Sequence, residues 1–64
     1  MLEFITLTRA EPHLKDQPIV VRVASIDTFN PNVLDAGQTL MRVNGKEFIV
    51  QESTQDVFNK IEGV

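Results

Sequence analysis

The chain has 64 residues, 42% of them hydrophobic, with no cysteine, one histidine and a formal net charge of −3. This composition indicates one small soluble domain, excludes disulfides, and argues against a zinc site because His13 would need carboxylates alone to complete the ligand set. A core of this size supplies only about 3 to 5 kcal/mol of net stability, so we expect the chain to associate with another chain.

The N-terminal half predicts strands separated by one long loop. Residues 2–8, "LEFITLT", are rich in β-branched and aromatic residues, which favours a strand. Residues 10–18 contain two prolines and should form an exposed loop that carries His13 in solvent. Residues 19–29, "IVVRVASIDTF", predict one long strand, or two strands with a bend near Ala24 and Ser25.

A loop is expected over residues 30–38. Pro31, between two asparagines, cannot continue a central strand and should end the preceding one. Asp35, Ala36 and Gly37 are then predicted to form a tight turn.

Asn44 and Gly45 predict a β-hairpin turn between residues 39–43 and 46–51. Asn-Gly is the pair that best tolerates the positive φ angles of a two-residue type I′ turn. A phosphate-binding loop would need more glycines and a following helix, whereas a strand follows here. The turn fixes the register, with the following pairs: Val43 with Lys46, Arg42 with Glu47, Met41 with Phe48, Leu40 with Ile49, and Thr39 with Val50.

Apolar residues occupy both faces of this predicted hairpin. One face gathers Met41, Val43, Phe48 and Val50. The opposite face is our candidate interaction surface and combines two apolar residues with a charged pair: Leu40, Ile49, Arg42 and Glu47. A half-exposed sheet alternates more cleanly, so we expect the strands to be covered on both sides by a curled sheet, by a helix or by a second subunit.

A C-terminal helix is predicted over about residues 53–62. Ser53 is a suitable N-cap, Asp56 lies in the first turn, and Gly63 can end the helix. Val57, Phe58 and Ile61 form the apolar stripe that should dock on the sheet. The expected fold is therefore mainly β with one C-terminal helix (α+β), a small antiparallel curled sheet of four to five strands in a single domain over residues 1–64.

No residue pattern predicts an active site. The one histidine lies in a proline-bearing loop, which argues against a nucleophilic triad. Five carboxylates could in principle form a catalytic pair, but acidic residues in this number usually form a solvated surface: Asp27, Asp35, Glu47, Glu52 and Asp56. Residues 51–54 could offer helix amides to an anion, although capping by Ser53 explains them better. We expect a protein that is not an enzyme and uses no cofactor or metal.

Several short motifs resemble the FlbD family of small flagellar and swarming-motility proteins, also called the SwrD type, together with similar small phage or prophage proteins. The resemblance covers most of the chain through "LTR", a strand ending in isoleucine and an acidic residue, "NGKEFIVQES", and "VFNKI". The matching positions are Leu7, Thr8, Arg9, Ile26, Asp27, Thr39, Asn44, Gly45, Lys46, Val50, Glu52, Ser53, Val57, Lys60 and Ile61. The resemblance implies a bacterial or phage accessory protein that acts through protein–protein interaction, without catalytic residues.

Two alternative functions stay open. The opening "MLEFITLTR" resembles the carbon-storage-regulator family of RNA-binding homodimers, although six scattered basic residues and the net negative charge argue against nucleic acid as a partner. A small-ligand or nucleotide sponge formed between subunits is the other alternative. We expect a cytoplasmic homo-oligomer that binds a protein partner, since no apolar run approaches the about 18 residues of a membrane span.

Overall fold

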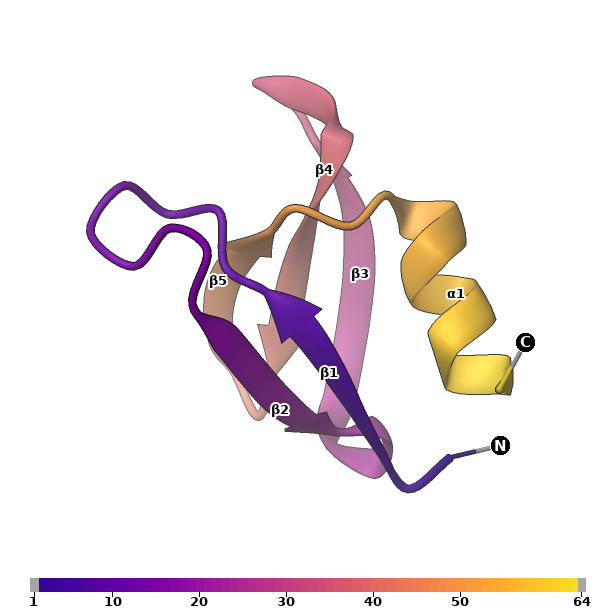
Figure 1. Cartoon of the computed structure of the whole chain (residues 1–64). Coiled ribbons are helices and arrows are strands. Elements are labelled where there is room, and N and C mark those ends of the chain that lie inside the picture. Colours follow the sequence, from indigo (N-terminus) through magenta and orange to yellow (C-terminus); the bar gives the residue numbers. More distant parts are fainter. Residues whose placement is uncertain (1, 64) are drawn as a thin grey trace.

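A computed structural model describes residues 2–63, which form five strands and one C-terminal helix (Figure 1). The first sheet pairs β1 (Phe4–Thr8) with β2 (Pro18–Arg22), and a short 3-10 helix, η1 (Val23–Ser25), leads out of it. The second sheet has the order β3 (Ile26–Asn32), β4 (Asp35–Val43) and β5 (Lys46–Val50), and α1 (Thr54–Glu62) follows. All strand pairs are antiparallel, so the predicted mainly β fold with one C-terminal helix is confirmed.

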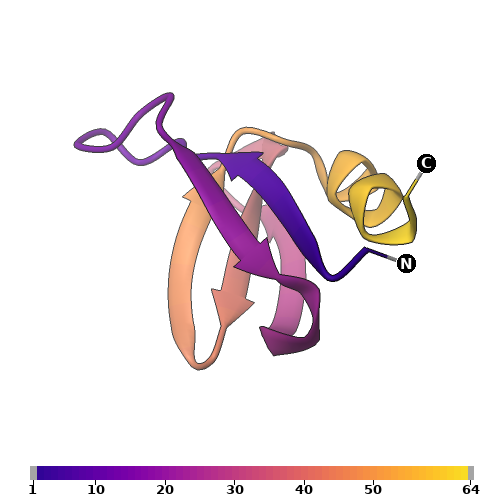
Figure 2. The same cartoon turned by 60° about the horizontal axis from the view of Figure 1, so that its bottom comes forward.

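The two sheets meet where β1 ends and β5 ends. An isolated bridge joins Arg9 to Val50, and the Gln51 amide donates to the Thr8 carbonyl over 2.8 Å. The strands therefore curl around one core, as the two views of the molecule show (Figures 1 and 2). Among residues 2–63, six buried apolar side chains form that core: Ile5, Leu7, Val21, Met41, Val50 and Val57.

The β4–β5 hairpin has the predicted register at all five pairs. Asn44 has a φ of 51° and Gly45 a φ of 79°, the two positive angles that a type I′ turn requires. The turn is also held to the start of β3, because the Gly45 amide donates to Asp27 Oδ2 over 2.9 Å and the Asn44 amide donates to the Ser25 carbonyl over 3.1 Å. Both local sequence and tertiary contacts thus fix this turn.

The segment expected as a single strand over residues 19–29 is two strands. The 3-10 helix η1 lies at the bend that was the alternative prediction near Ala24 and Ser25. In β2, Val21 is buried and Val20 is exposed, as the alternation along a strand requires.

The loop predicted over residues 30–38 is wrong. β3 continues to Asn32 and β4 already begins at Asp35, so Val33 and Leu34 make the turn and Asp35-Ala36-Gly37 do not. Pro31 is tolerated because β3 pairs only with β4, and the register places its missing N–H on the side away from β4. The ladder is irregular at this end, where the register shifts between Pro31 and Asn32.

The predicted helix is confirmed with its two caps. Ser53 Oγ accepts from the Asp56 amide over 3.1 Å, and Gly63 adopts the left-handed conformation with a φ of 81°. Val57 is fully buried and Ile61 packs against the core, but Phe58 is 50% exposed, so its place in the docking stripe is wrong. Val57 and Ile61 are four residues apart and share the helix face that packs on the sheet, whereas Phe58 is turned about 100° from Val57 around the helix axis. Within residues 2–63 no helix is long and apolar enough to cross a membrane.

Candidate protein-interaction site

The predicted interaction surface on β4 and β5 is mostly a charged surface. Arg42 and Glu47 form the expected cross-strand pair, with 3.4 Å between Arg42 Nη2 and Glu47 Oε2, and both side chains are 51% exposed. Leu40 and Ile49 pair beside them and are half-buried. A half-exposed ion pair of this kind contributes only a few tenths of a kcal/mol, and the two apolar neighbours offer little free surface.

The opposite face of the same hairpin is covered by the chain itself. Met41 and Val50 are fully buried, and Val43 and Phe48 are half-buried against the core. The expectation that both faces of the strands are covered is therefore met on one face only, because the first sheet and the helix cover Met41 and Val50, whereas Arg42 and Glu47 on the other face are half-exposed.

The polar residues of the FlbD-like motifs meet at the junction of β1, β4 and α1. The Glu52 carboxylate accepts from the Thr8 amide over 2.9 Å and from Thr8 Oγ1 over 3.0 Å. The buried Thr39 hydroxyl donates to the Glu52 carbonyl over 2.7 Å. These contacts tie the first strand to the start of the helix, so the motif residues have a structural role here.

Three of the carboxylates considered for a catalytic pair each bond to a different partner. Asp27 accepts from the Gly45 amide, Glu47 pairs with Arg42, and Glu52 accepts from Thr8. Across the part of the chain that the structure describes, residues 2–63, no cluster of three His, Cys, Asp or Glu side chains could hold a metal ion. His13 is exposed in the loop between β1 and β2, as predicted.

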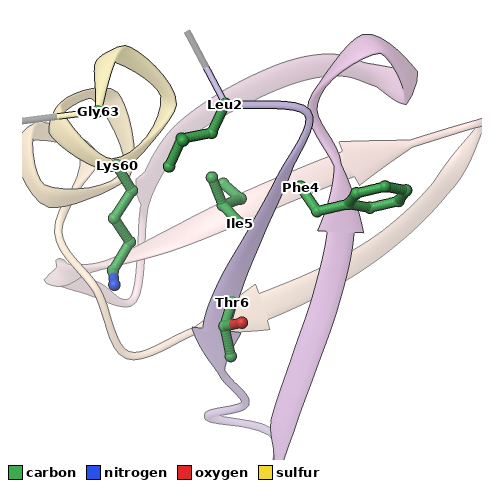
Figure 3. Close-up of a pocket in the computed structure, with 6 residues that line it drawn as sticks. All are labelled: Leu2, Phe4, Ile5, Thr6, Lys60 and Gly63. Atoms are coloured by element: carbon green, nitrogen blue, oxygen red, sulfur yellow. The ribbon is translucent and has the colours of Figure 1, made fainter.

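A groove lies between the middle of β1 and the C-terminal end of α1 (Figure 3). Its volume is about 410 Å³, and six residues line it: Leu2, Phe4, Ile5, Thr6, Lys60 and Gly63. In the close-up, Leu2 and Ile5 point toward the helix, Lys60 extends from the helix alongside β1, and the Phe4 ring points away from the groove. We call this the β1–α1 groove.

The backbone of β1 has an open edge along this groove. The hydrogen bonds from Val23 to Glu3 and from Arg9 to Gln17 continue the β1–β2 ladder, so odd-numbered residues of β1 bond to β2 and even-numbered ones face away from it. Within residues 2–63, the outward N–H and C=O groups of Phe4 and Thr6 have no hydrogen-bond partner. Such an edge can form backbone hydrogen bonds with a segment of another chain.

Both ends of that open edge are closed. At one end the Leu2 amide donates to the Ile61 carbonyl over 3.4 Å, and at the other Thr8 bonds to Glu52 and Gln51. The open part is therefore limited to about three residues, or roughly 10 Å at the rise of a strand. A long added strand would collide with α1 at one end and with residues 51–52 at the other, whereas a short segment or a turn fits.

Charge marks the groove on one side. The Lys60 side chain lines it and is exposed, and no salt bridge to Lys60 is formed within the described residues 2–63. Leu2 contributes an exposed apolar side chain, 51% accessible. The groove therefore combines apolar surface, free backbone groups and one positive charge.

A second exposed apolar feature lies at the turn between β3 and β4. Val33 is 97% exposed and Leu34 is 89% exposed, although turns of this length favour glycine, asparagine or aspartate. We call these two residues the hairpin tip. Asp35, which is exposed, follows them directly.

Sequence reasoning missed both features. The groove depends on the packing of α1 beside β1, two elements that lie far apart in the chain. No local sequence pattern therefore predicts it. The hairpin tip had a signal, since two aliphatic residues stand alone between residues typical of turns, Asn32 and Asp35.

Comparison of the chain with protein-family models, with curated proteins and with solved structures found no match. The relationship to the FlbD family therefore stays a prediction from the motifs.

Proposed function

We propose that this chain is a non-enzymatic accessory protein of the cytoplasm that acts through protein–protein interaction, the function implied by its resemblance to FlbD-type motility proteins. The β1–α1 groove is its contact site. The observation that carries the proposal is the open edge of β1, where the Phe4 and Thr6 backbone groups face a groove that also holds Leu2 and Lys60.

The groove is suited to a short apolar segment that is followed or preceded by a carboxylate. Free N–H and C=O groups on Phe4 and Thr6 can bond to the backbone of the segment, as in recognition by strand edges. Leu2 and Ile5 offer apolar contact to one side chain, and Lys60 offers a charge partner to an acidic one. The closed ends of the edge limit the segment to a few residues.

The distribution of positive charge favours a protein over RNA. Each of the three arginines pairs with a carboxylate, Arg9 with Glu11, Arg22 with Glu3 and Arg42 with Glu47. Arginines engaged in this way are poor contacts for phosphates, which bind clusters of unpaired basic side chains.

The proposal is tested with a displayed library of short disulfide-closed peptide loops selected against the immobilised chain. Selected loops should share an apolar residue next to an acidic one. Their binding should be lost when the Thr6 amide is N-methylated by chemical synthesis, since that removes an outward donor that the fold does not use. Lys60→Glu should weaken binding at least tenfold, because it places like charges together.

Two controls make this test specific. N-methylation of the Glu47 amide, which faces away from β4 on the outer edge of β5, applies the same chemical change elsewhere and should leave binding intact. Val20→Thr alters an exposed residue of β2 outside the groove and should also leave it intact. Loops that bind the Thr6 and Lys60 variants as tightly as the unmodified chain would contradict the groove as the contact site.

A further inference from the structure

The hairpin tip has the chemistry that the β1–α1 groove is suited to receive. Val33 and Leu34 are the two most exposed large apolar side chains among the described residues, and Asp35 supplies a carboxylate directly after them. The tip is a turn, so it presents a short segment and meets the length limit set by the closed ends of the β1 edge.

The tip cannot reach the groove of its own chain. The molecule is 29 Å along its longest axis, and Figure 1 shows the tip at the top and the start of β1 at the bottom. The β3–β4 hairpin is held at the end away from the tip, where residues 39–43 of β4 pair with β5, so the tip projects from a fixed base. Only a second molecule can bring a tip to the groove.

We infer that the partner of the β1–α1 groove is the hairpin tip of a second copy of this chain, so that molecules associate head to tail. Val33 and Leu34 of one copy contact Leu2 and Ile5 of the next, and Asp35 lies against Lys60. This inference rests on the function proposed above, because it uses the same groove and names its occupant.

Charge and geometry both support this occupant. The tip carries a negative charge next to its apolar residues, and the groove carries a positive charge next to its own. Because the two complementary surfaces differ, the contact is heterologous, and each added copy leaves one free tip and one free groove. Such association continues into rings or open chains, whereas a contact between identical surfaces would stop at a dimer.

Sedimentation of the full chain from micromolar to millimolar concentration tests the inference. The average mass should rise with concentration past that of a dimer. The tip variant Val33→Ser with Leu34→Asn and the groove variant Lys60→Glu should each lose this rise and remain monomeric. Val20→Thr, which changes an exposed apolar residue outside both surfaces, should behave as the unaltered chain does.

A mixture of the two variants gives the decisive result. The tip variant keeps an intact groove and the Lys60 variant keeps an intact tip. In an equimolar mixture, the tip of the Lys60 variant can bind the groove of the tip variant. The tip and groove that remain free are both altered, so association should end at a dimer with one chain of each kind. A monomeric unaltered chain at millimolar concentration, a tip variant that still associates, or a mixture without dimer would each overturn the inference. If selected loops still bind the groove of a monomeric chain, the proposed function stands while this inference fails.

Discussion

Two hairpins share β4, and their turns are built on opposite principles. At the β4–β5 turn, Asn44 and Gly45 adopt positive φ angles and are hydrogen-bonded to Asp27 and Ser25. At the β3–β4 turn, neither Val33 nor Leu34 has a positive φ angle, and their side chains are almost wholly exposed. The residues of the first turn stabilise the fold, because they adopt the backbone angles that the turn requires. The second is filled with residues that a turn does not need, which points to a role outside the folded chain.

The largest expected effect comes from truncating a core side chain that both hairpins share. Met41 is fully buried and pairs with Phe29 in one hairpin and Phe48 in the other. Met41→Ala should lower the free energy of unfolding by about 3 kcal/mol, because it leaves a cavity in the core. Urea denaturation followed by circular dichroism measures this. Leu34→Ala, the same kind of truncation at the exposed tip, is the matched control and should cost less than about 0.5 kcal/mol.

The next largest effect comes from placing a valine in each of the two turns and comparing the loss of stability. Gly45→Val should cost about 1 to 2 kcal/mol, because a β-branched residue tolerates positive φ badly even where, as here, its side chain has open space. Leu34→Val introduces the same side chain at the other turn and should change the urea midpoint little. Equal midpoint shifts for the two variants would show that the turns do not differ as described.

A smaller effect concerns the anchoring of the Asn-Gly turn. Asp27→Ala removes the acceptor of the Gly45 amide and should cost about 0.5 to 1 kcal/mol, since the bond is exposed to solvent. Hydrogen exchange at the Gly45 amide should accelerate in this variant. Unchanged protection of that amide would mean that the turn geometry alone holds it.

The smallest effect on stability is expected at the hairpin tip. Val33→Ser combined with Leu34→Asn should alter the free energy of unfolding by less than about 0.5 kcal/mol, because neither side chain is buried. Thermal unfolding monitored by circular dichroism is the measurement. A large loss of stability would assign these residues to the fold of the single chain and remove the reason to look for a partner.

The same contrast explains what could be predicted from the sequence. The Asn44–Gly45 turn, its register and the capped helix follow from local rules, because backbone angles and caps are set by adjacent residues. The β3–β4 turn was misplaced because Pro31 reads as a strand terminator unless one knows that β3 lies at a sheet edge. Edge position is a property of the assembled sheet.

The β1–α1 groove could not be predicted from the sequence for the same reason. The expected face of Leu40, Arg42, Glu47 and Ile49 exists with the predicted pairing, yet its apolar residues are half-buried. Alternation along a strand shows which residues share a face, but not what covers that face. The β1–α1 groove arises only when Leu2 and Lys60 are brought together across the whole chain.

The junction between Thr8 and Glu52 has a consequence for the order of folding. Strand neighbours in each sheet are also neighbours along the chain, so both sheets can form early from local segments. The Thr8–Glu52 hydrogen bonds join residues 44 positions apart and form only after both ends of the chain are in place. A late contact of this kind is absent from the transition state, so Thr8→Val is expected to quicken unfolding while refolding keeps its rate.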